Sequence, residues 1–307
     1  MEFTLHPSID MARRGNFDVL SKYAWCIPSG GDIVILVLMF LLGALIGTGV
    51  VFIVALFMGG SADTFAAEYG TLISYPIMFI PPMMWAAGQS RRNRMEYKGL
   101  ALDNGNVAPH GWFLCVLMVM AATLAAGIVG DLSTSWLPPM PAWLEEALKG
   151  LTTGNIWINF ICVSLFAPFF EEWLCRGMVE RGLLGRGVKP VWAIVLSALF
   201  FAVIHLNPWQ AIPAFLLGCL FGYVYYKTGS LKLTMLMHFT NNTFALIMGH
   251  VDSLENAESW MDVLGPGYWY CFAAAVLLLV LVIKAFAKIP LEGRKGAFEV
   301  LPSAFED

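Results

Sequence analysis

The sequence predicts an all-α membrane protein that crosses the bilayer about eight times. Of its 307 residues, 58% are hydrophobic and only 13% are charged, whereas soluble domains carry about 25% charged residues. Apolar stretches long enough for a membrane helix, which needs about 20 residues, recur along the chain. Lipid admits only helices or closed barrels, and the sequence lacks the alternating pattern of barrel strands. We therefore expect a bundle of transmembrane helices.

Eight apolar segments are candidate spans. The first is too long for the apolar core of a signal peptide, so we expect it to stay in the membrane. Spans five and six are joined by only a few residues around Asn207, and span five is short, which predicts a tight hairpin. The spans cover residues 33–58, 71–88, 111–130, 156–180, 191–206, 209–226, 232–250 and 267–287.

Basic residues gather in alternate loops, which predicts the orientation of the chain. They are Arg13, Arg14 and Lys22; Arg91, Arg92, Arg94 and Lys98; Arg181, Arg186 and Lys189; Lys227 and Lys232; and Lys288, Arg294 and Lys295. Because Lys and Arg are retained in the cytoplasm, both termini are expected there. We expect an N-terminal arm (1–31) partly at the interface, a transmembrane domain (32–290) and a cytoplasmic tail (291–307).

The composition also limits the partners and the cellular location. The basic residues lie in short loops and form no continuous face, so nucleic acid is not an expected partner. Six cysteines without a CxxC pair indicate neither a disulfide framework nor a cysteine metal cluster. Compact loops and the absence of organelle signals favour a multi-pass protein of a bacterial plasma membrane, with the lipid bilayer as its main partner.

Span four contains charges that an apolar helix seldom carries. Glu171, Glu172 and Arg176 lie in it, and each charge at the bilayer centre costs about 2.5–3.5 kcal/mol on insertion scales. Glu172 and Arg176 are four residues apart, so we expect them to form a structural ion pair on one helical face. Glu171 is rotated by about 100° from Glu172 and has no base four positions on, so it needs a partner from another helix.

Two later spans supply possible partners. Span five ends at His205, and span seven contains His238 and Asn242 on one face. Carboxylate, imidazole and carboxamide groups can activate water and donate hydrogen bonds to a developing oxyanion. Taken singly, a histidine at a helix end or an asparagine that joins helices is ordinary structure. Their occurrence together on successive spans favours a hydrolytic site.

Three short stretches resemble signatures of one known family. This is the CPBP family of CAAX-prenyl-protease and bacteriocin-processing intramembrane proteases, also called the Abi family. Its EExxxR, FxxxH and HxxxN signatures are matched, in family order, by Glu171-Glu172-xxx-Arg176, Phe201-xxx-His205 and His238-xxx-Asn242. The motif-bearing core covers about residues 156–250, and the eight-helix layout is similar to the bundle of the CAAX prenyl proteases.

The resemblance implies a hydrolase, an intramembrane endopeptidase or metalloprotease that cleaves a membrane-associated protein or peptide. Glu171 would be the essential catalytic carboxylate, Glu172 would support it, and His205, His238 and Asn242 would complete the site. Two mechanisms stay open. Either Glu171, His205 and His238 bind Zn²⁺ and leave one position for water, or Glu171 with His205 acts as general base while His238 and Asn242 form an oxyanion hole.

Two other functions are open at this level. Some members of the family are immunity or scaffold proteins, so the chain is alternatively a non-catalytic CPBP-type bacteriocin-immunity or membrane scaffold protein. A transporter that moves protons on its buried Glu and His is a third reading, since intramembrane acids also mark ion paths. Other protease classes fit less well, because the sequence has no HExxH motif, no GxSG motif and no pair of intramembrane aspartates.

Overall fold

The computed structural model describes a helical membrane protein over residues 20–58, 62–95, 99–103, 105–153, 155–251 and 259–291. Four helices in these ranges are long and apolar enough to cross a membrane, namely Gly30–Met58, Gly111–Asp131, Ile156–Gly185 and Trp260–Ala287. Together with the other apolar helices they confirm the all-α polytopic fold. Residues 1–19 of the predicted N-terminal arm and residues 292–307 of the predicted tail lie outside the described residues.

A helix occupies each predicted span; most ends differ by up to five residues, but the helix at the second span begins nine residues before the predicted start. The outer helices are α1 (Gly30–Met58), α2 (Ala62–Asn93), α3 (Gly111–Asp131) and α12 (Tyr268–Ala287). The inner ones include α8 (Pro190–Val203), α9 (Pro208–Thr228) and α10 (Leu231–Met248). The short helices α4 (Ala142–Thr153) and α11 (Trp260–Leu264) lie in connections that the sequence had predicted to be loops.

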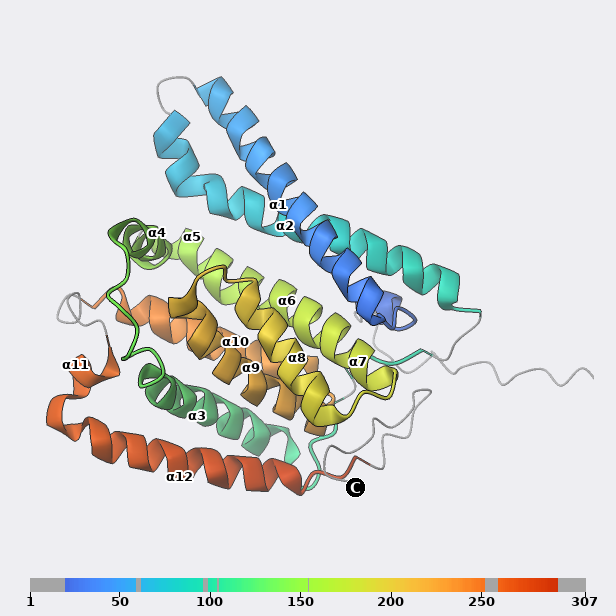
Figure 1. The fold of residues 1–307 in the computed structure, drawn as a ribbon, viewed down its shortest axis with the longest axis vertical. Helices are drawn as coiled ribbons and strands as arrows, with labels where there is room; N and C mark the ends of the chain where they lie inside the picture. Colours follow the sequence, from blue (N-terminus) through green and yellow to red (C-terminus); the bar gives the residue numbers. More distant parts are fainter. Residues whose placement is uncertain are drawn as a thin grey trace, which may run out of the picture.

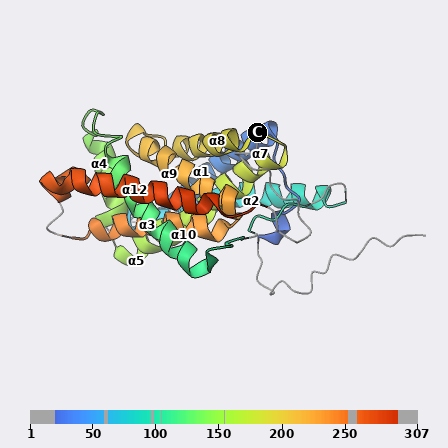
Figure 2. The same cartoon turned by 90° about the horizontal axis from the view of Figure 1, so that it is seen from below.

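The helices form two packed groups on either side of the fourth span. Helices α1 and α2 lie together along the α5–α7 side of the bundle (Figure 1). Helices α3 and α12 pack side by side on the opposite side. In the perpendicular view, α8 lies on one side of the bundle and α10 with α5 on the other (Figure 2). The fourth span is thus enclosed between the α1–α2 hairpin and the inner helices.

Two glycines bring α1 and α2 close together. A Cβ atom at Gly47 would lie 2.8 Å from the Ser74 carbonyl oxygen, and one at Gly43 would overlap the Met78 carbonyl. Small residues at this GxxxG spacing let membrane helices pack backbone against backbone. The close approach fixes where the residues of α2 stand relative to the rest of the bundle.

The fourth span is not the plain α-helix that the sequence predicted. It runs as α5 (Ile156–Asn159), a π-helical segment η4 (Phe160–Phe166), α6 (Ala167–Glu172), a second π-helical segment η5 (Trp173–Glu180) and α7 (Arg181–Gly185). Segments of π-helix are rare and are frequently found at functional sites. The two acidic residues of the EExxxR motif are the last two residues of the short helix α6.

The π register leaves one backbone carbonyl of η4 without a partner in its own helix. The Ala167 N–H bonds to the Cys162 carbonyl, five residues back, instead of to Val163. The residue five positions after Val163 is Pro168, which has no N–H to offer. The Val163 carbonyl therefore needs a donor from another helix, and α10 supplies it.

Helices α8 and α9 form the short hairpin that the sequence predicted. Helix α8 has 14 residues and is about 21 Å long at 1.5 Å per residue. The chain turns through Leu206, whose φ is +57°. Asn207 then caps α9, its side chain accepting a hydrogen bond of 2.9 Å from the Gln210 N–H. His205 lies in this turn rather than in the helix.

Candidate active site

A buried cluster of charged side chains joins the fourth span to α10. Arg176 donates from Nη1 to Oε1 of Glu172 at 2.8 Å, and the same carboxylate oxygen lies 3.1 Å from Nδ1 of His238. Glu172 and Arg176 are fully buried, and His238 is 4% exposed. Two of the three motifs therefore meet directly, through one oxygen atom of Glu172.

Arg176 is held in place by its surroundings. Its Nη2 donates to the Gly218 carbonyl of α9 at 2.9 Å. Its guanidinium also lies over the rings of Phe201 and Phe221, at 4.8 and 5.4 Å from their centroids, an arrangement that stabilises a desolvated cation. The arginine thus serves as a fixed counter-ion that links η5 to α8 and α9.

The contact with Glu172 sets the orientation of the His238 ring. A carboxylate only accepts hydrogen bonds, so Nδ1 of His238 carries the proton and donates it. This leaves Nε2 as the nitrogen available for chemistry. A carboxylate that fixes the tautomer of a histidine and stabilises its protonated form is the arrangement found in catalytic triads.

Glu171 has a different environment from its neighbour. Its Oε1 accepts a hydrogen bond from the hydroxyl of Tyr75 on α2. Among the described residues, Glu171 forms no ion pair. Phe79 packs beside Tyr75 on α2, with ring centroids 5.6 Å apart, and stacks on Phe170 at 5.0 Å, which holds α2 against this part of α6.

The His205 ring is oriented by α8, the helix that ends two residues before it. Its Nδ1 lies 2.8 Å from the Phe201 carbonyl, and because a carbonyl only accepts, Nδ1 is the donor and Nε2 the free acceptor. The Phe201 ring contacts both histidines edge-on, at 5.0 Å from His205 and 5.5 Å from His238. The phenylalanine of the FxxxH motif therefore packs against both imidazoles.

Asn242 is used to join helices. Its Nδ2 donates to the Val163 carbonyl at 2.8 Å, the carbonyl that the π register leaves without a helical partner. Its Oδ1 accepts from Asn241 at 3.1 Å. The carboxamide has a second N–H on Nδ2, and an oxyanion role would have to use that one.

The predicted zinc ligands are not assembled into a ligand set. Among the residues that the structure describes, no group of three or more His, Cys, Asp or Glu side chains is arranged to hold a metal ion. Glu171 accepts a hydrogen bond from Tyr75, whereas the bonded Nδ1 atoms of His205 and His238 leave both Nε2 atoms free. This arrangement does not match the predicted set of Glu171, His205 and His238, and zinc binding itself stays a prediction.

Comparison with protein families bears directly on this segment. Residues 153–244 match the family described as type II CAAX prenyl endopeptidase Rce1-like. The motif-bearing core is similar to this family. The match confirms the resemblance that the three motifs indicated, and at the level of the family it supports a CAAX-type intramembrane endopeptidase. Comparisons with curated proteins and with solved structures gave no match.

Tyr75 is the site residue that the sequence did not single out. It lies on α2, outside the Rce1-like segment, and nothing in its immediate sequence marks it as functional. The available signal was indirect, since Gly43 and Gly47 are spaced as in closely packed membrane helices and so indicated that α1 has a tight neighbour. Which side chain of α2 would then reach the fourth span depends on the tertiary packing.

Proposed function

We propose that this protein is an intramembrane endopeptidase that hydrolyses a peptide bond of a membrane-associated protein or peptide. The observation that carries the proposal is the contrast between two adjacent carboxylates. Glu172 is neutralised by Arg176 and His238, whereas Glu171 meets only the hydroxyl of Tyr75 among the described residues. A carboxylate without a paired cation retains its ability to take a proton, which is what a general base requires.

The chain's own groups can then be assigned to the steps of hydrolysis. Glu171 takes a proton from water as the water oxygen attacks the peptide carbonyl carbon, and later delivers it to the leaving amine. Nε2 of His205 accepts the second hydrogen bond of that water and orients it. The developing oxyanion is met by Nε2 of His238, which donates a hydrogen bond when the ring carries both protons, and by the second N–H of Asn242.

A zinc-dependent version of this proposal would use Glu171, His205 and His238 as ligands, and the metal would act as a Lewis acid on the carbonyl. The arrangement of these side chains favours the metal-free version, because Glu171 is engaged with Tyr75 and no three-residue ligand set is formed among the described residues. A chelator distinguishes the two. We expect activity of the purified protein to be unchanged after prolonged treatment with a zinc chelator, and loss of activity that returns with zinc would support the metal version.

The test of the proposed function is turnover of a membrane-tethered peptide by the purified full-length protein in lipid vesicles. We expect Glu171→Gln and His205→Ala to lower the rate by at least about 100-fold, since general acid–base groups contribute about 10²–10⁴-fold. Glu68→Gln is the matched control, because it removes an exposed carboxylate from α2, away from the site. Equal cleavage by the wild type and both site variants would rule out the assignment.

The proposed orientation of the protein in the membrane follows from the positions of the basic loops. We propose that both termini face the cytoplasm of a bacterial cell and that the substrate is embedded in, or anchored to, the same membrane. Reporter fusions after residue 58 and after residue 93 test the orientation, with the cytoplasmic reporter expected to be active only at the second position.

A further inference from the structure

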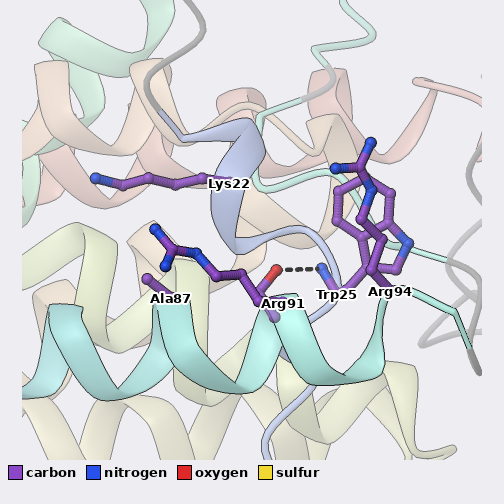
Figure 3. A pocket seen from close by; sticks show the side chains of 6 residues that line it. Lys22, Trp25, Ala87, Arg91 and Arg94 are labelled. Carbon is purple, nitrogen blue, oxygen red and sulfur yellow. Dashed lines mark hydrogen bonds between the residues drawn. The ribbon is translucent and has the colours of Figure 1, made fainter.

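A second candidate site lies at the far end of α2, away from the proposed catalytic groups. It is a pocket of about 170 Å³ between the last turns of α2 and the short helical turn η2 (Ser21–Tyr23) that precedes α1. Lys22, Trp25, Ala87, Ser90, Arg91 and Arg94 line it (Figure 3). Because α2 becomes polar from Gln89 onward, the pocket lies where this helix leaves the apolar part of the membrane.

The walls of the pocket are held by hydrogen bonds. The Trp25 N–H donates to Oγ of Ser90 at 3.2 Å, and the side chain of Asn93 donates to the Trp25 carbonyl at 3.2 Å. The guanidinium of Arg94 lies over the indole ring at 4.9 Å. The segment before α1 is thereby fixed to the end of α2, and the cavity between them is part of the fold rather than an accident of surface side chains.

The lining of the pocket is positively charged and unbalanced. Lys22, Arg91 and Arg94 contribute three cations, and no carboxylate of the described residues lines the cavity. Within the described parts of the chain, none of the three forms an ion pair. Figure 3 shows the Lys22 and Arg91 side chains extending to the same side of Trp25, with Arg94 on the indole.

An ordinary explanation covers only part of this charge. Basic residues at the end of a helix interact favourably with its dipole, and loop cations orient a membrane protein. Both effects account for Arg91 and Arg94. The loop charge also covers Lys22, but neither effect explains why this lysine, which comes from a different element, faces the same cavity. Three like charges around one cavity are most stable when an anion lies between them, and the planar guanidinium matches the oxygens of a phosphate.

The apolar surface next to the pocket indicates what kind of anion fits. Ile80, Met84, Ala87, Arg91 and Arg94 follow one another at intervals of four or three residues, so they share one face of α2. Ile80 is 48% and Met84 69% exposed, so neither is covered by another helix. A ligand lying along this face contacts the cations at one end and the exposed apolar side chains of Ile80 and Met84, the apolar strip, at the other.

We propose that this pocket binds the phosphate of an anionic phospholipid, with an acyl chain lying along Ile80 and Met84. Basic pockets at the membrane surface are suited to anionic headgroups, and Trp25 is the aromatic type enriched at that depth. Free phosphate would satisfy the cations but leaves the exposed apolar strip without a role, so the lipid is the better fit. The site is independent of the proposed proteolysis.

Binding to the purified full-length protein tests the proposal, with phosphatidylglycerol, phosphatidylcholine and inorganic phosphate as separate probes. Native mass spectrometry counts bound lipid, and a fluorescent phosphatidylglycerol titration gives the affinity. The double variant Arg91→Gln/Arg94→Gln removes two of the cations. Its matched control is Lys284→Gln/Lys288→Gln, which removes two exposed cations from the end of another membrane helix, α12. Met84→Ser tests the apolar strip separately.

We expect the wild type to prefer phosphatidylglycerol over phosphatidylcholine. The Arg91→Gln/Arg94→Gln variant should bind phosphatidylglycerol about 30-fold more weakly, since each basic residue near an anionic headgroup contributes about fivefold. Met84→Ser should weaken binding of the lipid and leave inorganic phosphate unaffected, and the Lys284/Lys288 control should behave as wild type. Equal loss in the two double variants, equal affinity for the two lipids, or binding of inorganic phosphate without the lipid preference would each overturn the assignment.

Discussion

Replacing Tyr75 with phenylalanine removes a single hydroxyl and leaves the ring that packs on Phe79. In the structure this hydroxyl is the donor to Oε1 of Glu171. Hydrogen bonds to charged groups contribute about 1.5–3 kcal/mol, which corresponds to about 10- to 100-fold at 1.4 kcal/mol per factor of ten. If Tyr75 positions the proposed base, Tyr75→Phe should lower kcat by that factor. KM should change little, because the hydroxyl acts on the base and not on substrate binding.

The assay is steady-state cleavage of a membrane-tethered peptide, with the unfolding temperature measured on the same samples. Tyr69→Phe is the matched control, since it removes a hydroxyl from the exposed end of α2, where the ring stacks on Phe65. The control should retain full activity, and Tyr75→Phe should unfold within a few degrees of the wild type. A Tyr75→Phe enzyme with unchanged kcat, or one whose loss is matched by Tyr69→Phe, would refute the positioning role.

Three further predictions concern the framework of the site and the segment before α1. Arg176→Met should destabilise the protein by about 3–5 kcal/mol in thermal or denaturant unfolding, because it leaves Glu172 buried without its cation. Adding Glu172→Gln should restore much of this lost stability. A double variant no more stable than the single one would contradict this account. Gly43→Leu should separate α1 from α2, since its side chain would overlap the Met78 carbonyl; cysteine cross-linking between the two helices reports the separation, and unchanged cross-linking would count against the close approach. Burial raises the pKa of the Cys26 thiol to about 11. At pH 7.5 the native protein should therefore react with a maleimide at Cys26 far more slowly than the unfolded protein. Rapid labelling of the native protein would contradict this expectation.

The helices of this protein were largely predictable because lipid imposes strict conditions on the backbone. Apolar length sets where a helix can cross, and glycine, proline or charge ends it, so α3 at Gly111–Asp131 differs by one residue from the predicted span 111–130. The ion pair of Glu172 and Arg176 was foreseeable from their four-residue spacing alone. Each of these features depends only on residues close together in the sequence.

The remaining features depend on contacts between distant parts of the chain. No local sequence pattern predicts a π-helical segment. Its consequence is a Val163 carbonyl without a partner in its own helix, and the hydrogen bond from Asn242 to that carbonyl forms only when α10 is in place. The contact of Tyr75 with Glu171 spans 96 residues. The sequence also predicted Glu171, His205 and His238 as one possible metal set, whereas the described residues form no such set and Glu171 contacts Tyr75 of a distant helix.

The shortness of α8 has a consequence for how water reaches a reaction inside the membrane. A helix of about 21 Å cannot match a hydrocarbon layer of about 30 Å, and a bilayer relieves such a mismatch by thinning locally around the short helix. The thinned region would lie over the turn that carries His205. For the proposed hydrolysis, such thinning would shorten the distance that water has to cross in the lipid to reach His205.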